Sequence, residues 1–212
     1  MTSLGPREVG VTVELSWQNV DGDSFTEVFE KAVVNIPPVS SGTVLDSPAG
    51  PVGYFLFRNF VEPAVADLDA EFAAFRLAGV RELVVDLRYN SGGLLSVAQV
   101  LSNLIGGEIT QGQTQYTLEY NPDNSFRNQR VTFLDRVQSL DLTRVFFIVT
   151  GSSASASELV INALRPYLDV VLVGDTTFGK PVGQLGYTFC EKTLRPVSFS
   201  IVNADGVGDY FD

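Results

Sequence analysis

The order of hydrophobic and polar positions predicts a short antiparallel opening, followed by strands and helices in alternation. Residues 10–17 alternate in polarity as a half-buried strand does, and Asp21, Gly22 and Asp23 then supply turn chemistry. Residues 36–51 are rich in Pro, Ser and Gly, which predicts a linker or surface excursion. We therefore expect an N-terminal β-rich segment and linker at residues 1–51 and a core at residues 52–212.

The first half of this core has the pattern of two strand-and-helix units. An apolar run at 54–57 predicts a strand, and Pro63 begins a helix that ends at Gly79. The apolar run 83–87 predicts the next strand, and the loop 88–93 leads into a second helix. The apolar residues of the two helices recur three and four positions apart: Val65, Leu68, Phe72 and Phe75 in the first, and Leu94, Val97, Ala98, Leu101 and Leu104 in the second. This rhythm predicts an α/β fold of βαβ units.

The second half begins with a polar, glycine-bearing stretch at 106–130, which predicts a mobile excursion over the surface. The remaining predicted elements are a strand at 145–149, a helix at about 156–168, a strand at 170–173 and extended stretches at 187–189 and 197–202. The serine-rich segment 151–158 therefore lies between a buried strand and a helix. Reactive groups are often exposed at this position of an α/β fold.

Composition narrows the possible functions. The chain has 212 residues, 45% of them hydrophobic, which is enough for one sizeable core. A formal net charge of −11 argues against a nucleic-acid partner, because phosphates require clustered Lys and Arg. Cys190 is the single cysteine, and the Asp21–Asp23 and Asp205–Gly206 turns lack calcium-loop spacing. We expect neither a metal nor a cofactor.

The absence of histidine directs attention to Ser155 and Lys180. A serine nucleophile needs a base, and this chain cannot supply the imidazole of a Ser-His-Asp triad. Of its three lysines, only Lys180 lies in a glycine-flanked turn among apolar residues. A lysine becomes a base only when burial lowers its pKa from about 10.4 towards 7. Gln184, four residues on, could orient the amine. The alternative is an exposed Lys180 paired with Asp175.

Ser155 and the glycine loop have structural alternatives as well. Ser155 and Glu158 form a capping box of the S-x-x-E type, which by itself accounts for both residues. Asn90–Gly93 has the composition of an ordinary βα turn. In the functional interpretation, the backbone N–H of Ala156 and that of Gly92 form an oxyanion hole at neighbouring strand ends.

Three motifs together resemble peptidase family S41, the carboxyl-terminal processing or tail-specific proteases. They are Asp-Leu-Arg-Tyr-Asn-Ser-Gly-Gly at 86–93, Ser-Ala-Ser-Ala-Ser-Glu at 153–158 and Thr-Phe-Gly-Lys at 177–180. The resemblance covers about residues 52–205. It implies a crotonase-like α/β core with a mixed sheet, a Ser155 nucleophile, a Lys180 general base and Gln184 as its orienter. It also implies an oxyanion hole from Ala156 and either Gly92 or Gly93.

The resemblance further implies a polypeptide substrate, no cofactor and an extracytoplasmic location. The chain departs from the family pattern at Ser91, where Pro is common, and at Pro166, where many members have Asp. Residues 1–50 lack a complete PDZ domain, residues 1–6 lack a signal peptide, and the chain stops earlier than family members usually do. We therefore expect a fragment. Two rivals share the fold: a non-catalytic module that binds an apolar ligand or a peptide, and an acyl-CoA enzyme.

Overall fold

The computed structural model describes residues 4–6, 8–40 and 42–208, and the chain divides into two compact units. The first unit ends at Ile36, and the second begins at Pro37. In the first unit, β1 (Thr12–Gln18) and β2 (Ser24–Glu30) pair in antiparallel fashion. The Asn19 side chain accepts the backbone N–H groups of Asp21 and Asp23 and so fixes the turn between them. The predicted antiparallel opening is confirmed.

The division between the units lies earlier than the boundary that we expected between residues 51 and 52. β3 (Thr43–Ser47) pairs in antiparallel fashion with β4 (Gly50–Leu56), so part of the expected linker belongs to the core sheet. The Ser47 hydroxyl donates to the Gly50 carbonyl at 2.7 Å, and Gly50 has a φ of +115°. The small residues of this stretch therefore close a hairpin, which explains why composition alone suggested a linker.

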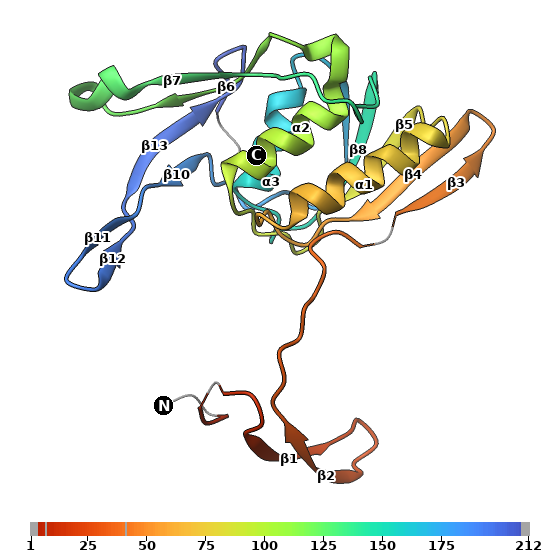
Figure 1. Cartoon of the computed structure of the whole chain (residues 1–212), viewed down its shortest axis with the longest axis vertical. Helices are drawn as coiled ribbons and strands as arrows, with labels where there is room; N and C mark the ends of the chain where they lie inside the picture. The colour runs from red at the N-terminus through yellow and green to blue at the C-terminus, as the bar shows by residue number, and fades with distance from the viewer. Residues whose placement is uncertain (1–3, 7, 41, 209–212) are drawn as a thin grey trace. The chain divides into compact units, whose positions relative to one another are not determined.

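The main sheet has five strands in the order β3-β4-β5-β8-β9. The last four strands run parallel, and β3 makes the sheet mixed. Three helices pack beside one another against this sheet, with α2 between α1 and α3 (Figure 1). The bounds are β5 (Glu82–Asp86), β8 (Arg144–Val149), β9 (Asp169–Gly174), α1 (Ala64–Leu77), α2 (Leu95–Thr110) and α3 (Ala156–Leu164). The predicted βαβ organisation is confirmed.

A second, antiparallel sheet has the order β10-β13-β6-β7. Its strands are β6 (Thr114–Glu119), β7 (Gln129–Thr132), β10 (Val182–Gln184) and β13 (Val197–Val202), with the 3₁₀ helix η1 (Pro122–Arg127) between β6 and β7. The description of 106–130 as a surface excursion was therefore wrong for β6, where Gln115 and Tyr116 are buried. A separate hairpin of β11 (Tyr187–Phe189) and β12 (Lys192–Leu194) projects from this sheet (Figure 1).

A phenylalanine cluster in the core anchors the loops that carry the candidate chemistry. The rings of Phe57 and Phe60 lie 4.5 Å apart and edge to face, and both residues are fully buried. Burial of each ring contributes roughly 1.5–3 kcal/mol to folding. The Phe60 backbone donates to the Gly92 carbonyl at 3.2 Å and accepts from the Leu94 N–H at 2.8 Å. The core thus holds both ends of the Gly92–Gly93 segment.

The predicted helix stripes are largely buried. Leu68, Phe72 and Phe75 of α1 are at most 1% exposed. Leu94 differs from the prediction, because it precedes α2 in extended backbone and its side chain is 48% exposed. Within the described part of the chain, no helix combines the length and the apolar character that a membrane crossing requires.

Candidate active site

Ser155 is the N-cap of α3 and lies six residues after the end of β8, which pairs with β5. Its φ of +56° and ψ of −112° are unusual for a residue with a side chain. Such backbone costs of the order of 1–3 kcal/mol and is retained where the surrounding structure imposes it, often at functional sites. The Ser155 N–H donates to the Glu158 carboxylate at 2.7 Å, which is the glutamate half of the predicted capping box.

Glu158 also binds the loop that carries Lys180. Its side chain is buried, and its Oε1 accepts the Thr177 hydroxyl at 2.7 Å and the Gly179 N–H at 2.6 Å. Its Oε2 accepts the Lys180 N–H at 2.9 Å, next to the bond from Ser155. One carboxylate therefore fixes the backbone of both Ser155 and Lys180. The sequence indicates only the helix cap for Glu158, because nothing in its position along the chain predicts contacts with residues 19 to 22 positions away.

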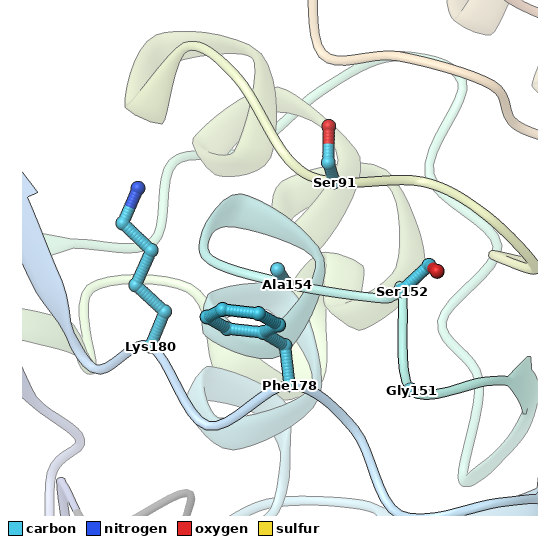
Figure 2. A pocket seen from close by; sticks show the side chains of 6 residues that line it. All are labelled: Ser91, Gly151, Ser152, Ala154, Phe178 and Lys180. Carbon is cyan, nitrogen blue, oxygen red and sulfur yellow. The ribbon is translucent and has the colours of Figure 1, made fainter.

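Lys180 lies at the edge of a cavity of about 380 Å³. The cavity is lined by Ser91, Gly151, Ser152, Ala154, Phe178 and Lys180. Figure 2 shows the Lys180 and Ser152 side chains on opposite sides, with Ala154 and Phe178 between them. Ser155 follows the lining residue Ala154 directly in the chain. Among the described residues, Lys180 has no ion pair with Asp175 or with any other carboxylate.

Gly92 packs directly against the turn at Ser155. A Cβ atom on Gly92 would lie 2.6 Å from the Ala154 carbonyl oxygen, 2.7 Å from the Ala156 nitrogen and 2.9 Å from the Ser155 Cβ. Its φ of +97° also favours glycine. Only a residue without a side chain allows this approach, so the structure brings together the glycine loop and the helix start, as we predicted.

The two glycines differ in what their N–H groups do. The Gly92 N–H donates to the Asn90 Oδ1 at 3.0 Å within the loop. In the part of the chain that the structure describes, the N–H groups of Gly93 and Ala156 have no hydrogen-bond acceptor. Phe60 pairs with Gly93 through the flanking Gly92 carbonyl and Leu94 N–H, so the Gly93 N–H points away from Phe60. Gly93 and Ala156 therefore retain the donors that an oxyanion requires.

Three buried polar residues that we did not single out hold the two loops together. The Asn90 amide donates to the Phe57 carbonyl at 2.8 Å, and the Asn90 carbonyl accepts the Ser157 hydroxyl at 2.9 Å. The Ser153 hydroxyl donates to the Leu87 carbonyl at 2.7 Å. In the segment 153–157, the two outer serines are therefore structural, and Ser155 is the partly exposed one. Ser153 and Ser157 each lie two residues from Ser155, and this spacing was the feature of the sequence that could have indicated their structural role.

Asp86 and Arg88 form an ion pair at the start of this loop. The Arg88 Nη2 lies 2.7 Å from the Asp86 Oδ2, and the Asp86 side chain is fully buried. Tyr54 donates its hydroxyl to the same oxygen at 2.9 Å. Burial alone raises the pKa of Asp86, but the hydrogen bonds from the Arg88 side chain and backbone and from Tyr54 outweigh it. The pKa of Asp86 is therefore lower than its ordinary value.

Gln184, the residue that we expect to orient Lys180, lies four residues after it in β10. Gln184 is exposed at the end of β10, and among the described residues no hydrogen bond joins the two side chains. The register between β10 and β13 shifts between Gly183 and Gln184. Such a shift interrupts the alternation that would place residues 180 and 184 on one face of a strand. Across the described positions, no cluster of acidic or cysteine side chains could hold a metal ion.

Solved structures resemble this chain over most of its length. A protein described as an S41 protease, from Bacteroides fragilis NCTC 9343, is 27% identical with a TM-score of 0.78 over 94% of this chain and 57% of its own. The photosystem II D1 C-terminal processing protease is 21% identical, with a TM-score of 0.68 over 96% of this chain and 53% of its own. These likenesses and the mixed sheet confirm the predicted crotonase-like α/β core.

The sequence comparisons define the family. The model of peptidase family S41 matches residues 51–203, and the chain belongs to this family. A probable CtpA-like serine protease of Staphylococcus epidermidis is 29% identical over 145 residues, which are 68% of this chain and 28% of that protein. Its counterpart in Staphylococcus aureus strain COL is 30% identical over the same shares. The chain thus spans little more than a quarter of the length of these relatives.

Proposed function

We propose that the chain is the catalytic core of a serine endopeptidase of the carboxyl-terminal processing type. The observation that carries the proposal is the Glu158 carboxylate, which binds the backbone of Ser155 and of Lys180 on the same oxygen. A cap alone requires only the bond to Ser155. Membership of family S41 and relatives named as serine proteases support the same activity.

In the proposed first step, the Ser155 hydroxyl attacks the scissile carbonyl carbon of a polypeptide. The neutral Lys180 amine accepts the hydroxyl proton as the new C–O bond forms. The resulting ammonium then donates this proton to the leaving amine, and the C–N bond breaks to leave an ester on Ser155. Water then attacks the ester carbonyl carbon while Lys180 accepts one of its protons. The ester C–O bond breaks, Lys180 returns the proton to the Ser155 oxygen, and the acyl fragment leaves with a new carboxyl group.

The tetrahedral intermediate places a negative charge on the former carbonyl oxygen. We assign its stabilisation to the N–H groups of Ala156 and Gly93, since Gly92 donates to Asn90. The positive end of the α3 dipole, roughly half an elementary charge, acts at the same place. Loss of one such donor typically lowers kcat by about 10²–10³-fold. Gly92 contributes the close packing that brings the two donors together.

Gln184 is the third member of the proposed triad. It can orient Lys180 only if its side chain turns towards the amine when substrate binds. Replacement of Gln184 with alanine is therefore expected to lower kcat less than replacement of Lys180. For the protein as a whole, we propose polypeptide substrates and an extracytoplasmic location, because the relatives are CtpA-like proteases.

Peptide hydrolysis by matched variants tests this proposal. Ser155→Ala and Lys180→Ala should each abolish cleavage of an unfolded protein such as casein, while their circular dichroism spectra stay unchanged. Ser152→Ala is the control, because Ser152 is an exposed serine that lines the same cavity. Wild-type turnover in either of the first two variants would contradict the proposal. The non-catalytic rival instead predicts saturable uptake of an apolar fluorophore and no cleavage by any variant.

A further inference from the structure

A second cavity, of about 460 Å³, carries two arginines beside the candidate active site. It is lined by Leu56, Arg58, Arg88 and Tyr89. Leu56 and Asp86 are paired across β4 and β5, and the Phe57 N–H donates to the Asp86 carbonyl at 2.9 Å. Arg58 and Arg88 each follow this pair by two residues. The two parallel strands therefore place the backbones of Arg58 and Arg88 side by side, about 5 Å apart. Both side chains line the same cavity.

Most of the hydrogen-bond donors of the two arginines remain available. Arg88 uses Nε and Nη2 on Asp86, and Arg58 donates from Nη1 to the Pro37 carbonyl at 3.2 Å. A guanidinium has five N–H donors. Among the described residues, Arg58 has no ion pair, and no acidic side chain lines the cavity. With one charge balanced by Asp86, the cavity keeps a net positive charge in a chain of net charge −11.

The two cavities lie at either end of one short loop. Arg88 and Tyr89 line the second cavity, and Ser91 lines the first. Three residue steps span at most about 11 Å. The Tyr89 N–H donates to the Thr150 Oγ1 at 3.3 Å, and Thr150 immediately precedes Gly151, which lines the first cavity. An extended peptide covers this distance with three or four residues, so a peptide bound in the first cavity can reach the arginines.

Tyr89 gives the arginine cavity an apolar side. It has a φ of +65°, and its side chain is 77% exposed. Left-handed backbone is costly for a residue with a side chain, and here the bond to Thr150 helps to hold it. Leu56 adds a half-buried aliphatic surface. A peptide segment next to a carboxylate group therefore has both an apolar contact and charged donors within reach.

We infer that the cavity of Arg58, Arg88 and Tyr89 is a subsite for a carboxylate group of the peptide substrate, a few residues from the scissile bond. The carboxylate is either the free C-terminus of the peptide or the side chain of an aspartate or glutamate. Two guanidinium groups recognise the planar carboxylate through paired hydrogen bonds, which lysine does not offer. This inference rests on the proposed peptidase function.

Binding of labelled peptides to Ser155→Ala protein tests the subsite without turnover. The probes are three rhodamine-labelled pentapeptides: Gly-Ala-Leu-Ala-Ala with a free carboxyl terminus, the same peptide as its amide, and an amide with glutamate at the fourth position. Fluorescence anisotropy gives each Kd at low and at 0.5 M NaCl. Charge-assisted hydrogen bonds should make one or both acidic probes bind about tenfold more tightly than the neutral amide at low salt.

Arg58→Gln in the same background should bring the Kd ratio of acidic to neutral probe close to 1. Arg81→Gln is the matched control, because Arg81 is an exposed arginine just before β5, at its other end. A tighter free acid alone identifies the terminal carboxylate as the ligand, and a tighter glutamate probe identifies a side chain. Equal affinity for all three probes, or an acidic preference that survives Arg58→Gln, would overturn the subsite.

Hydrolysis by the wild-type protein separates this inference from the proposed function. If no peptide is cleaved while Arg58-dependent binding persists, the peptidase proposal fails and the carboxylate site stands as a binding site. If cleavage occurs and neither binding nor cleavage distinguishes the acidic from the neutral probe, the subsite fails and the peptidase proposal stands. Arg88 is unsuitable for this test, because its replacement would leave the buried Asp86 without its partner.

Discussion

At the scale of single residues, Gly92 sets the geometry around Ser155. Gly92→Ala should be destabilising, because the new Cβ would lie 2.6 Å from the Ala154 carbonyl oxygen in left-handed backbone. Gly112→Ala is the control: its φ is +75° and nothing lies within 4 Å of its Cβ position. We expect the control to lose about 1–2 kcal/mol from backbone strain. Gly92→Ala should lose about 1–3 kcal/mol more from overpacking, as measured by urea unfolding. Equal losses would show that the close contact is unimportant.

Asp86 should make the stability of the protein sensitive to acid. Its folded pKa lies below the unfolded value of about 3.9, so its contribution is fully present above that pH and is lost as the pH falls through the folded pKa. Asp86→Asn should therefore lower the free energy of unfolding at pH 7, because it removes the carboxylate that Arg88 and Tyr54 bind, and its deficit relative to the wild type should narrow below about pH 4. Tyr54→Phe, which removes one hydrogen bond, should cost about 1 kcal/mol. Chemical unfolding measures the free energy of unfolding of Asp86→Asn and of the wild type. A difference between the two that stays constant from pH 7 to pH 3 would contradict this account.

At the scale of elements, Glu158 couples the start of α3 to the loop between β9 and β10. Glu158→Gln replaces one acceptor oxygen by an amide that faces N–H donors, and each unsatisfied donor costs about 1–3 kcal/mol. Under the proposed mechanism, kcat should fall at least tenfold with a smaller change in KM. Thr177→Val removes one of the four donors and should cost about 1 kcal/mol. If Glu158→Gln and Thr177→Val lose the same stability and the same activity, Glu158 does not couple the start of α3 to the loop between β9 and β10.

The elements that the sequence predicted best are those with strong apolar periodicity. The helix stripe at Leu68, Phe72 and Phe75 is buried as expected. The strand at 145–149 forms as expected, and its alternate residues Val145, Phe147 and Val149 are buried. β6 was not predicted, because its polar Gln115 is buried through a hydrogen bond to Asn103 at 3.2 Å, which no local pattern reveals. Ser155, Lys180 and the glycine loop followed from motifs. The contacts of Glu158 with residues 177–180 depend on the fold and could not be predicted.

At the scale of the whole molecule, the two compact units should differ in independent stability. Of the residues that the structure describes, those of the unit 37–212 form both large sheets and the helices α1 to α3, whereas those of the first unit form the β1–β2 hairpin alone. An isolated two-stranded hairpin is marginal in water at best. A chain of residues 37–212 should therefore unfold cooperatively in urea with nearly the midpoint of the full chain, and residues 1–36 alone should show no cooperative transition. Loss of cooperative unfolding in the truncated core would show that the core depends on the first unit.

The reactivity of Ser155 tests the central claim most directly. Intact protein treated with a fluorophosphonate should gain one phosphonyl group, as the Ser155 oxygen displaces fluoride from phosphorus. Mass spectrometry of the digested protein should place the adduct on Ser155. Ser155→Ala should not react, Lys180→Ala should react at least a hundredfold more slowly, and Ser152→Ala should react like the wild type. An adduct on Ser152, or labelling of Ser155 at an unchanged rate without Lys180, would contradict the proposed Ser155 and Lys180 pair.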